Sequence, residues 1–162
     1  KNLTIMKKIA ILAAAIVMLA GCGNLSSTAI KDLKGDELIN AIEGQSFVMS
    51  ANQMVPMGAP SKMLDGSNFV KIEGNTIESA LPYFGRATSV PYGGGTALHF
   101  KAEILEYKIM TKAKSTMVYV KTRNTEDVYE YNFDIYDNGT AYLSVNAINR
   151  DPVRFHGKIK AK

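Results

Sequence analysis

The chain has 162 residues, which suits one domain, because domains typically contain roughly 100–200 residues. Its hydrophobic content of 46% and charged content of 21% exclude a wholly disordered protein. One cysteine and two histidines exclude an intramolecular disulfide and a zinc-finger type of site. The formal net charge of +4 would suit a nucleic-acid-binding protein, so its source along the chain matters.

The N-terminal segment is typical of a bacterial export signal. Met6-Lys7-Lys8 supply positive charge, and an unbroken apolar run of 11 residues follows from Ile9 to Leu19. That run is too short for a stable transmembrane helix, which needs roughly 20 apolar residues. We therefore interpret it as the hydrophobic region of a signal peptide.

The apolar run ends in Leu19-Ala20-Gly21-Cys22, which resembles the lipobox of bacterial lipoproteins. The resemblance implies cleavage before Cys22, a diacylglycerol on its sulfur, and acylation of its new amino group, for example by palmitate. An ordinary signal peptide or a buried hydrophobic helix is the alternative. We predict a lipoprotein signal peptide over residues 1–21, a flexible tether over 22–29 and a single β-rich domain over 30–162.

The residues after the lipidation site predict a location in the cell envelope. Gly23 and Asn24 follow Cys22, so the aspartate that retains lipoproteins in the inner membrane is missing. By similarity with these sorting rules, we expect an outer-membrane lipoprotein, on the periplasmic side rather than the surface. Cleavage would remove three of the 19 basic residues, leaving 16 against 15 acidic ones. The excess charge therefore belongs to the export signal, and a nucleic-acid partner is excluded.

One short helix is predicted at the start of the domain. Gly35 interrupts the apolar pattern, so the helix should run from Asp36 to Glu43, with Asp36 as its cap and Gly44 at its C-cap. The apolar residues at near-helical spacing are Ile30, Leu33, Leu38, Ile39 and Ile42.

From Gln45 onward the apolar pattern alternates with a period of two, as expected for strands with one buried face. Asp137-Asn138-Gly139 is typical of a tight hairpin turn. The pattern predicts a mainly β protein with one N-terminal helix, an antiparallel meander that forms a small barrel or a curled sandwich. The predicted strands cover about 47–51, 69–73, 76–81, 102–111, 116–123, 129–135, 141–147 and 153–160.

The segment from Leu81 to Thr96 is the most distinctive part of the chain. LPYFGR and PYGGG combine aromatic rings, an arginine fork able to bind a carboxylate or phosphate, and flexible glycines. One interpretation is a loop that contacts a ligand or partner; the other is a structural corner in which Arg86 pairs with an internal acid such as Glu78. The candidate binding residues are Tyr83, Phe84, Arg86 and Tyr92.

The sequence resembles an uncharacterised family of exported proteins from gut-type anaerobic bacteria, known as domain of unknown function 4251. The resemblance lies in the LPYFGR and PYGGG motifs, the segment Phe47 to Pro56, and the terminal NR and FHG motifs. The resemblance covers roughly residues 45–160. It implies a small, β-rich, often lipid-anchored domain, and it supplies no activity, substrate or catalytic residue.

The sequence offers little support for catalysis. Ser89 and Ser115 lack the context of a nucleophile elbow, and no metal ligand set or cofactor motif is found. His99 is expected to be a structural histidine, and His156 a solvated one on the polar face of the last strand. We therefore predict no catalytic residue, no metal and no cofactor.

We expect a non-enzymatic domain that binds a small apolar or glycan ligand or an envelope protein. The alternatives are an accessory enzyme acting on envelope glycan or lipid, and a protein-binding, inhibitor-like module. Tyrosines on neighbouring strands could line a ligand pocket, or they could simply be core residues of a tryptophan-free sheet. The three tyrosines are Tyr129, Tyr131 and Tyr142.

Overall fold

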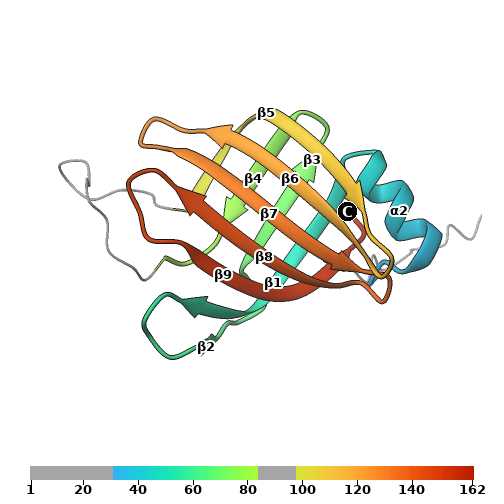
Figure 1. Cartoon of the computed structure of the whole chain (residues 1–162), viewed down its shortest axis with the longest axis horizontal. Coiled ribbons are helices and arrows are strands. Elements are labelled where there is room, and N and C mark those ends of the chain that lie inside the picture. The colour runs from blue at the N-terminus through green and yellow to red at the C-terminus, as the bar shows by residue number, and fades with distance from the viewer. Residues whose placement is uncertain (1–30, 84–97) are drawn as a thin grey trace, which may run out of the picture.

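The described residues fold as a closed antiparallel barrel of eight strands, with a short additional strand and one helix (Figure 1). The computed structural model describes residues 31–83 and 98–162. Neighbouring strands pair in the order β2-β1-β3-β4-β5-β6-β7-β8-β9. The elements are α2 (Gly35–Glu43), β1 (Ser46–Pro56), β2 (Lys62–Met63), β3 (Phe69–Glu73), β4 (Thr76–Ala80), β5 (His99–Thr111), β6 (Ser115–Arg123), β7 (Val128–Tyr136), β8 (Thr140–Ala147) and β9 (Val153–Lys160).

Pairing between β1 and β9 closes the sheet and makes it a barrel rather than a sandwich. The ladder runs from Val48, opposite Lys160, to Pro56, opposite Val153, with an irregularity between Ala51 and Gln53. On its other edge β1 pairs with β3 and then with β2. The predicted mainly β fold with one helix is confirmed. Of the two predicted architectures, the closed sheet is a barrel and not a curled sandwich.

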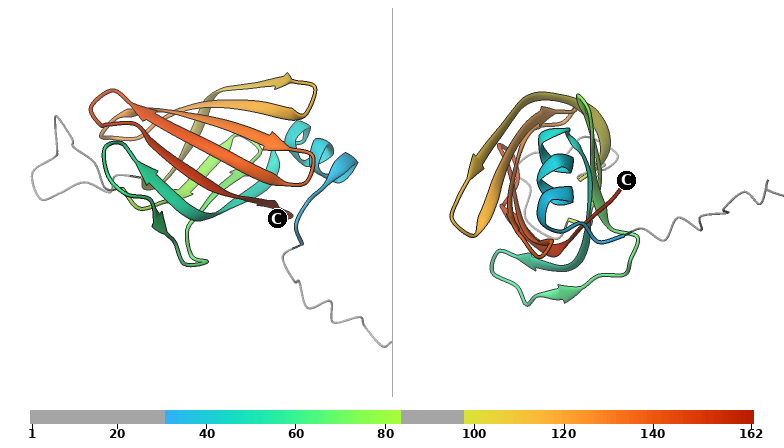
Figure 2. Two further views of the ribbon diagram at one scale, coloured as in Figure 1. Left: turned by 60° about the horizontal axis from the view of Figure 1, so that its bottom comes forward. Right: turned by 90° about the vertical axis from the view of Figure 1, so that its right-hand side faces the viewer.

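The helix α2 covers one end of the barrel (Figure 2). It begins at Gly35, whose φ of +54° suits glycine, and its buried residues are Leu38 and Ile42. The prediction that Asp36 caps the helix is wrong, because Lys34 occupies the N-cap position and makes no side-chain cap bond. Asp36 lies in the first turn, where its negative charge suits the helix dipole. Within the described ranges, no helix is long and apolar enough to cross a membrane.

A column of aromatic rings fills the barrel. Phe100 contacts Tyr129 at 4.9 Å between ring centroids, and Tyr129 contacts Tyr131 at 6.5 Å. The column continues from Tyr131 to Phe133 at 6.4 Å and from Phe133 to Phe47 at 5.8 Å. All of these side chains except Phe100 are fully buried. Tyr129 and Tyr131 are therefore core residues rather than the lining of an empty pocket.

The strand positions follow the predicted alternation, with three local differences. β1 continues to Pro56 instead of ending near Ala51, because β2 and β9 pair with its second half. β5 begins at His99 instead of residue 102, and a register shift between Ile104 and Glu106 interrupts its alternation. The two-residue strand β2 was not predicted, because a segment this short carries no alternation of its own. It forms by pairing with the long strand β1 at Gln53 and Met54.

Substitution of Gly157 by alanine should test the closure of the barrel. A Cβ atom at Gly157 would overlap the carbonyl oxygen of Ser50 across the β1–β9 ladder. We expect Gly157→Ala to lower the free energy of unfolding by about 3 kcal/mol or more in urea titrations, because backbone must shift to relieve the overlap. Gly66→Ala is the control, since a Cβ there meets open space. Equal stability of the two variants would contradict the closure.

Candidate functional site

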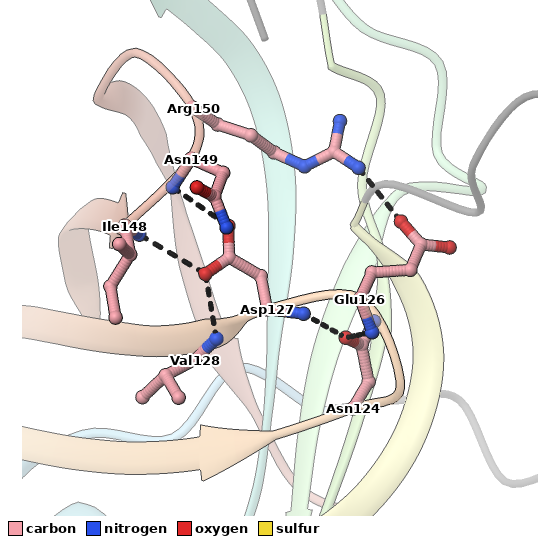
Figure 3. Close-up of polar contacts among 7 residues, drawn as sticks. All are labelled: Asn124, Glu126, Asp127, Val128, Ile148, Asn149 and Arg150. Atoms are coloured by element: carbon pink, nitrogen blue, oxygen red, sulfur yellow. Dashed lines mark hydrogen bonds and ion pairs between the residues drawn. The ribbon is translucent and has the colours of Figure 1, made fainter. Parts of the chain in front are cut away.

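The end of the barrel opposite α2 is built from a buried polar network (Figure 3). The carboxylate of Asp127 accepts hydrogen bonds from the backbone N–H groups of Val128, Ile148 and Asn149 at 2.8, 3.2 and 3.0 Å. The side-chain oxygen of Asn124 accepts from the N–H groups of Glu126 and Asp127, each at 2.8 Å. These bonds fix the β6–β7 turn against the β8–β9 turn.

A buried ion pair joins the same two turns. Arg150 Nη2 lies 2.7 Å from Glu126 Oε2, and the two side chains are only 6% and 10% exposed. The guanidinium also lies over the ring of Tyr83, 5.5 Å from its centroid, and the Tyr83 hydroxyl donates to the carbonyl of Asp151 at 3.2 Å. Burial raises the pKa of Tyr83. These contacts hold Tyr83 as an anchor at the end of β4.

The other predicted binding residues, Phe84, Arg86 and Tyr92, lie outside the described residues, as does Cys22. Glu78, the acid named as an alternative partner of Arg86, lies on the outside of β4. Its carboxylate is 3.1 Å from the ammonium group of Lys71 on β3. Glu78 is therefore a surface acid and not an internal one.

A groove of about 370 Å³ lies on the outer face of β6 to β9. Its centre is Tyr142, whose side chain is 43% exposed. The ring of Tyr142 meets His156 at 4.6 Å and 85°, and Tyr136 at 5.8 Å and 83°. The outward residues that line the groove are Met117, Asn132, Asp134, Tyr142, Ser144, Arg154 and His156.

Strand register brings this groove together. The β7–β8 hairpin places Asp134 opposite Tyr142, and the β8–β9 pairing places Tyr142 opposite His156. The hairpin turn uses Gly139 at a φ of +82°, as the Asp-Asn-Gly motif predicts. Tyr142 lies on the outer face of β8, and its ring neighbours depend on pairing across three strands, which the pattern of a single strand does not reveal.

His156 lies on the outer face of β9 as predicted, but it is half-buried and has protein partners. Its Nδ1 atom is 2.9 Å from the side-chain oxygen of Gln53 on β1, and its ring packs edge-on against Tyr142. His156 therefore fixes the position of the exposed tyrosine. His99 lies exposed at the first position of β5.

The polar groups of the groove suit an uncharged ligand rich in hydroxyl groups. Asp134 and Arg154 contribute one charge of each sign, and these two charges cancel. Asp134 Oδ1 is buried, and it has no hydrogen-bond partner among the residues that the structure describes. Asn132, Ser144 and Arg154 supply further polar side chains that can exchange hydrogen bonds with hydroxyl groups.

The perturbed carboxyl groups do not resemble a catalytic acid. Side-chain hydrogen bonds with Ser67, Lys162 and Lys108 lower the pKa values of Asp65, Glu73 and Glu106 respectively. A general acid at neutral pH needs the opposite shift. In residues 31–83 and 98–162, no group of three or more His, Cys, Asp or Glu side chains could hold a metal ion.

The buried ion pair should contribute strongly to stability. Glu126→Gln leaves the guanidinium of Arg150 buried without its charged partner, so we expect a loss of about 3 kcal/mol in the free energy of unfolding. Glu37→Gln is the matched control, because it breaks the exposed ion pair with Lys31 and should cost about 0.5 kcal/mol or less. Similar small losses in both variants would show that the turns do not depend on the buried pair.

Comparison with known proteins shows the family. The model of the family described as "Domain of unknown function (DUF4251)" matches residues 31–159. The crystal structure of a DUF4251 family protein from Bacteroides eggerthii is similar in fold, with a TM-score of 0.58 at 15% identity, over 78% of this chain and 86% of that one. No curated protein matches. The family resemblance in the motifs is thus confirmed, and the chain belongs to the DUF4251 family.

Proposed function

We propose that this protein is a lipid-anchored, non-enzymatic binding protein of the bacterial outer membrane that recognises an envelope glycan in the groove around Tyr142. The observation that carries the proposal is an exposed aromatic ring fixed between two perpendicular rings, in a groove lined by polar side chains. Its tether is the acylated Cys22, and its location is the periplasmic side of that membrane.

A sugar matches both the aromatic surface and the polar surface of the groove. The ring face of a tyrosine packs against the C–H face of a sugar, while its hydroxyl group offers a hydrogen bond. Asp134, Asn132 and Arg154 lie around that ring and can exchange hydrogen bonds with sugar hydroxyls. Fixing Tyr142 by His156 and Tyr136 reduces the ordering cost of binding.

The filled interior argues against transport of an apolar ligand inside the barrel. Such a ligand would have to displace fully buried rings from the aromatic column. Dispersion and burial hold these rings, and removal of one typically costs about 3–5 kcal/mol. An outer site avoids this cost.

A protein partner at the end of the barrel is the second candidate. The observation in its favour is the set of contacts among Arg150, Glu126 and Tyr83. Tyr83 is the third residue of the LPYFGR segment, so these contacts fix the start of that segment. Under this alternative the segment itself would supply the contact, with Arg86 as the residue that binds a carboxylate.

Substitution of Cys22 tests the anchor. Cys22→Ser cannot form the thioether, so we expect the protein to move from the membrane pellet to the soluble periplasmic fraction. Several acyl chains give stable anchoring, and their loss leaves no comparable attachment. Ser26→Ala, a few residues along the same segment, should stay in the membrane pellet. Membrane sedimentation of Cys22→Ser would refute the anchor.

Substitution of Tyr142 tests the groove. We expect Tyr142→Ala to weaken binding of solubilised envelope polysaccharide by about tenfold in affinity electrophoresis or calorimetry, because the central ring contact is lost. Leu105→Ala is the control, since it removes an exposed apolar side chain outside the groove. Unchanged binding by a folded Tyr142→Ala variant would exclude the groove as the glycan site.

A further inference from the structure

The β5–β6 hairpin presents an apolar and basic tip to solvent. β5 pairs with β4 only as far as Glu103, and beyond that point it continues with β6 alone. Near the tip, Ile109 and Met110 are 40% and 64% exposed. Lys112 and Lys114 stand in the turn that follows, which is closed by a hydrogen bond from Lys112 N to Ser115 O. We call residues 109–114 the hairpin tip.

The hairpin tip lies at the end of the barrel where the described chain begins (Figure 2). Hydrogen bonds from Leu33 N to Ile159 O and from Ala161 N to Lys31 O place that beginning beside the end of β9. The hairpin contacts α2 at the same end, because the Tyr107 hydroxyl donates to the carbonyl of Ile42 at 2.7 Å.

The two lysines of the hairpin tip differ from their neighbours because no described carboxylate pairs with them. Lys31 pairs with Glu37 at 2.9 Å, and Lys158 pairs with Asp32 at 3.2 Å, so these neighbours at the same end are neutralised. Lys112 and Lys114 form no ion pair with any other described residue. The tip therefore combines two exposed apolar side chains with two free positive charges.

We propose that the hairpin tip contacts the anionic surface of the membrane that holds the lipid anchor. This inference rests on the proposed acylation of Cys22. From Cys22 to Lys31 the chain spans nine residues, which reach at most about 32 Å when extended. The tether thus delivers the α2 end of the barrel to the membrane and keeps the hairpin tip at high effective concentration beside it.

The chemistry of the tip fits a lipid surface. Exposed lysines are attracted to anionic headgroups, and apolar side chains beside them enter the boundary between headgroups and acyl chains by about 5–10 Å. With Ile109 and Met110 inserted, the opposite end of the barrel, with Tyr83 and Ile148, faces away from the membrane. The contact would set the orientation of the domain rather than its attachment.

Fluorescence quenching in vesicles tests this orientation. The lipidated full-length protein is reconstituted in vesicles that contain phosphatidylglycerol and a nitroxide-labelled lipid. Met110→Cys supplies the only free thiol for a fluorophore, because the sulfur of Cys22 is blocked by the anchor. Ile148→Cys is the matched control, since Ile148 is 75% exposed at the opposite end of the barrel.

We expect severalfold stronger quenching of the label at residue 110 than at residue 148. The stronger quenching at residue 110 should be lost in the double variant Lys112→Glu/Lys114→Glu, and also in high salt. Flotation of the protein with the vesicles reports the anchor separately. Flotation with equal, weak quenching at both positions would overturn the hairpin contact alone, and failure to float would overturn the anchor and the contact together. Protection of residue 110 in native membranes but not in protein-free vesicles would indicate a protein partner and would also overturn the contact.

Discussion

The structure depends on the aromatic column that fills the barrel. Four fully buried rings, contributed by β1 and β7, stack along the interior, and Phe100 on β5 extends the column toward one end. Because the interior is packed, strand closure between β1 and β9 buries one continuous core. The same packing leaves the fully buried rings no room to line a ligand cavity inside the barrel.

The two ends and the outer face of the barrel differ in chemistry. One end is covered by α2, close to where the described chain begins, and the other is held by the Glu126–Arg150 pair and the carboxylate of Asp127. The outer face of β7 to β9 carries the ordered rings around Tyr142. Under the proposed function, the first end faces the membrane and the groove on the side receives the glycan.

Much of the fold could be predicted from the sequence because alternation in strands is local. It placed all eight strands of the barrel close to their observed positions. Features that depend on distant pairing could not be predicted, such as the closure of β1 on β9 or the contact between Gln53 and His156. The ion pair of Glu126 with Arg150 was missed for the same reason, since only the meeting of two turns creates it.

We propose that the ligand binds outside the filled barrel. Tyrosine-ring NMR of the folded protein distinguishes an outer site from an inner one, in titrations with envelope glycan fragments and, separately, with a long-chain fatty acid. We expect the glycan to shift the ring resonances of Tyr142 and Tyr136, while the resonances of the buried rings of Tyr129 and Tyr131 stay unchanged with both ligands. Saturable shifts of Tyr129 and Tyr131 by either ligand, with Tyr142 unmoved, would contradict it.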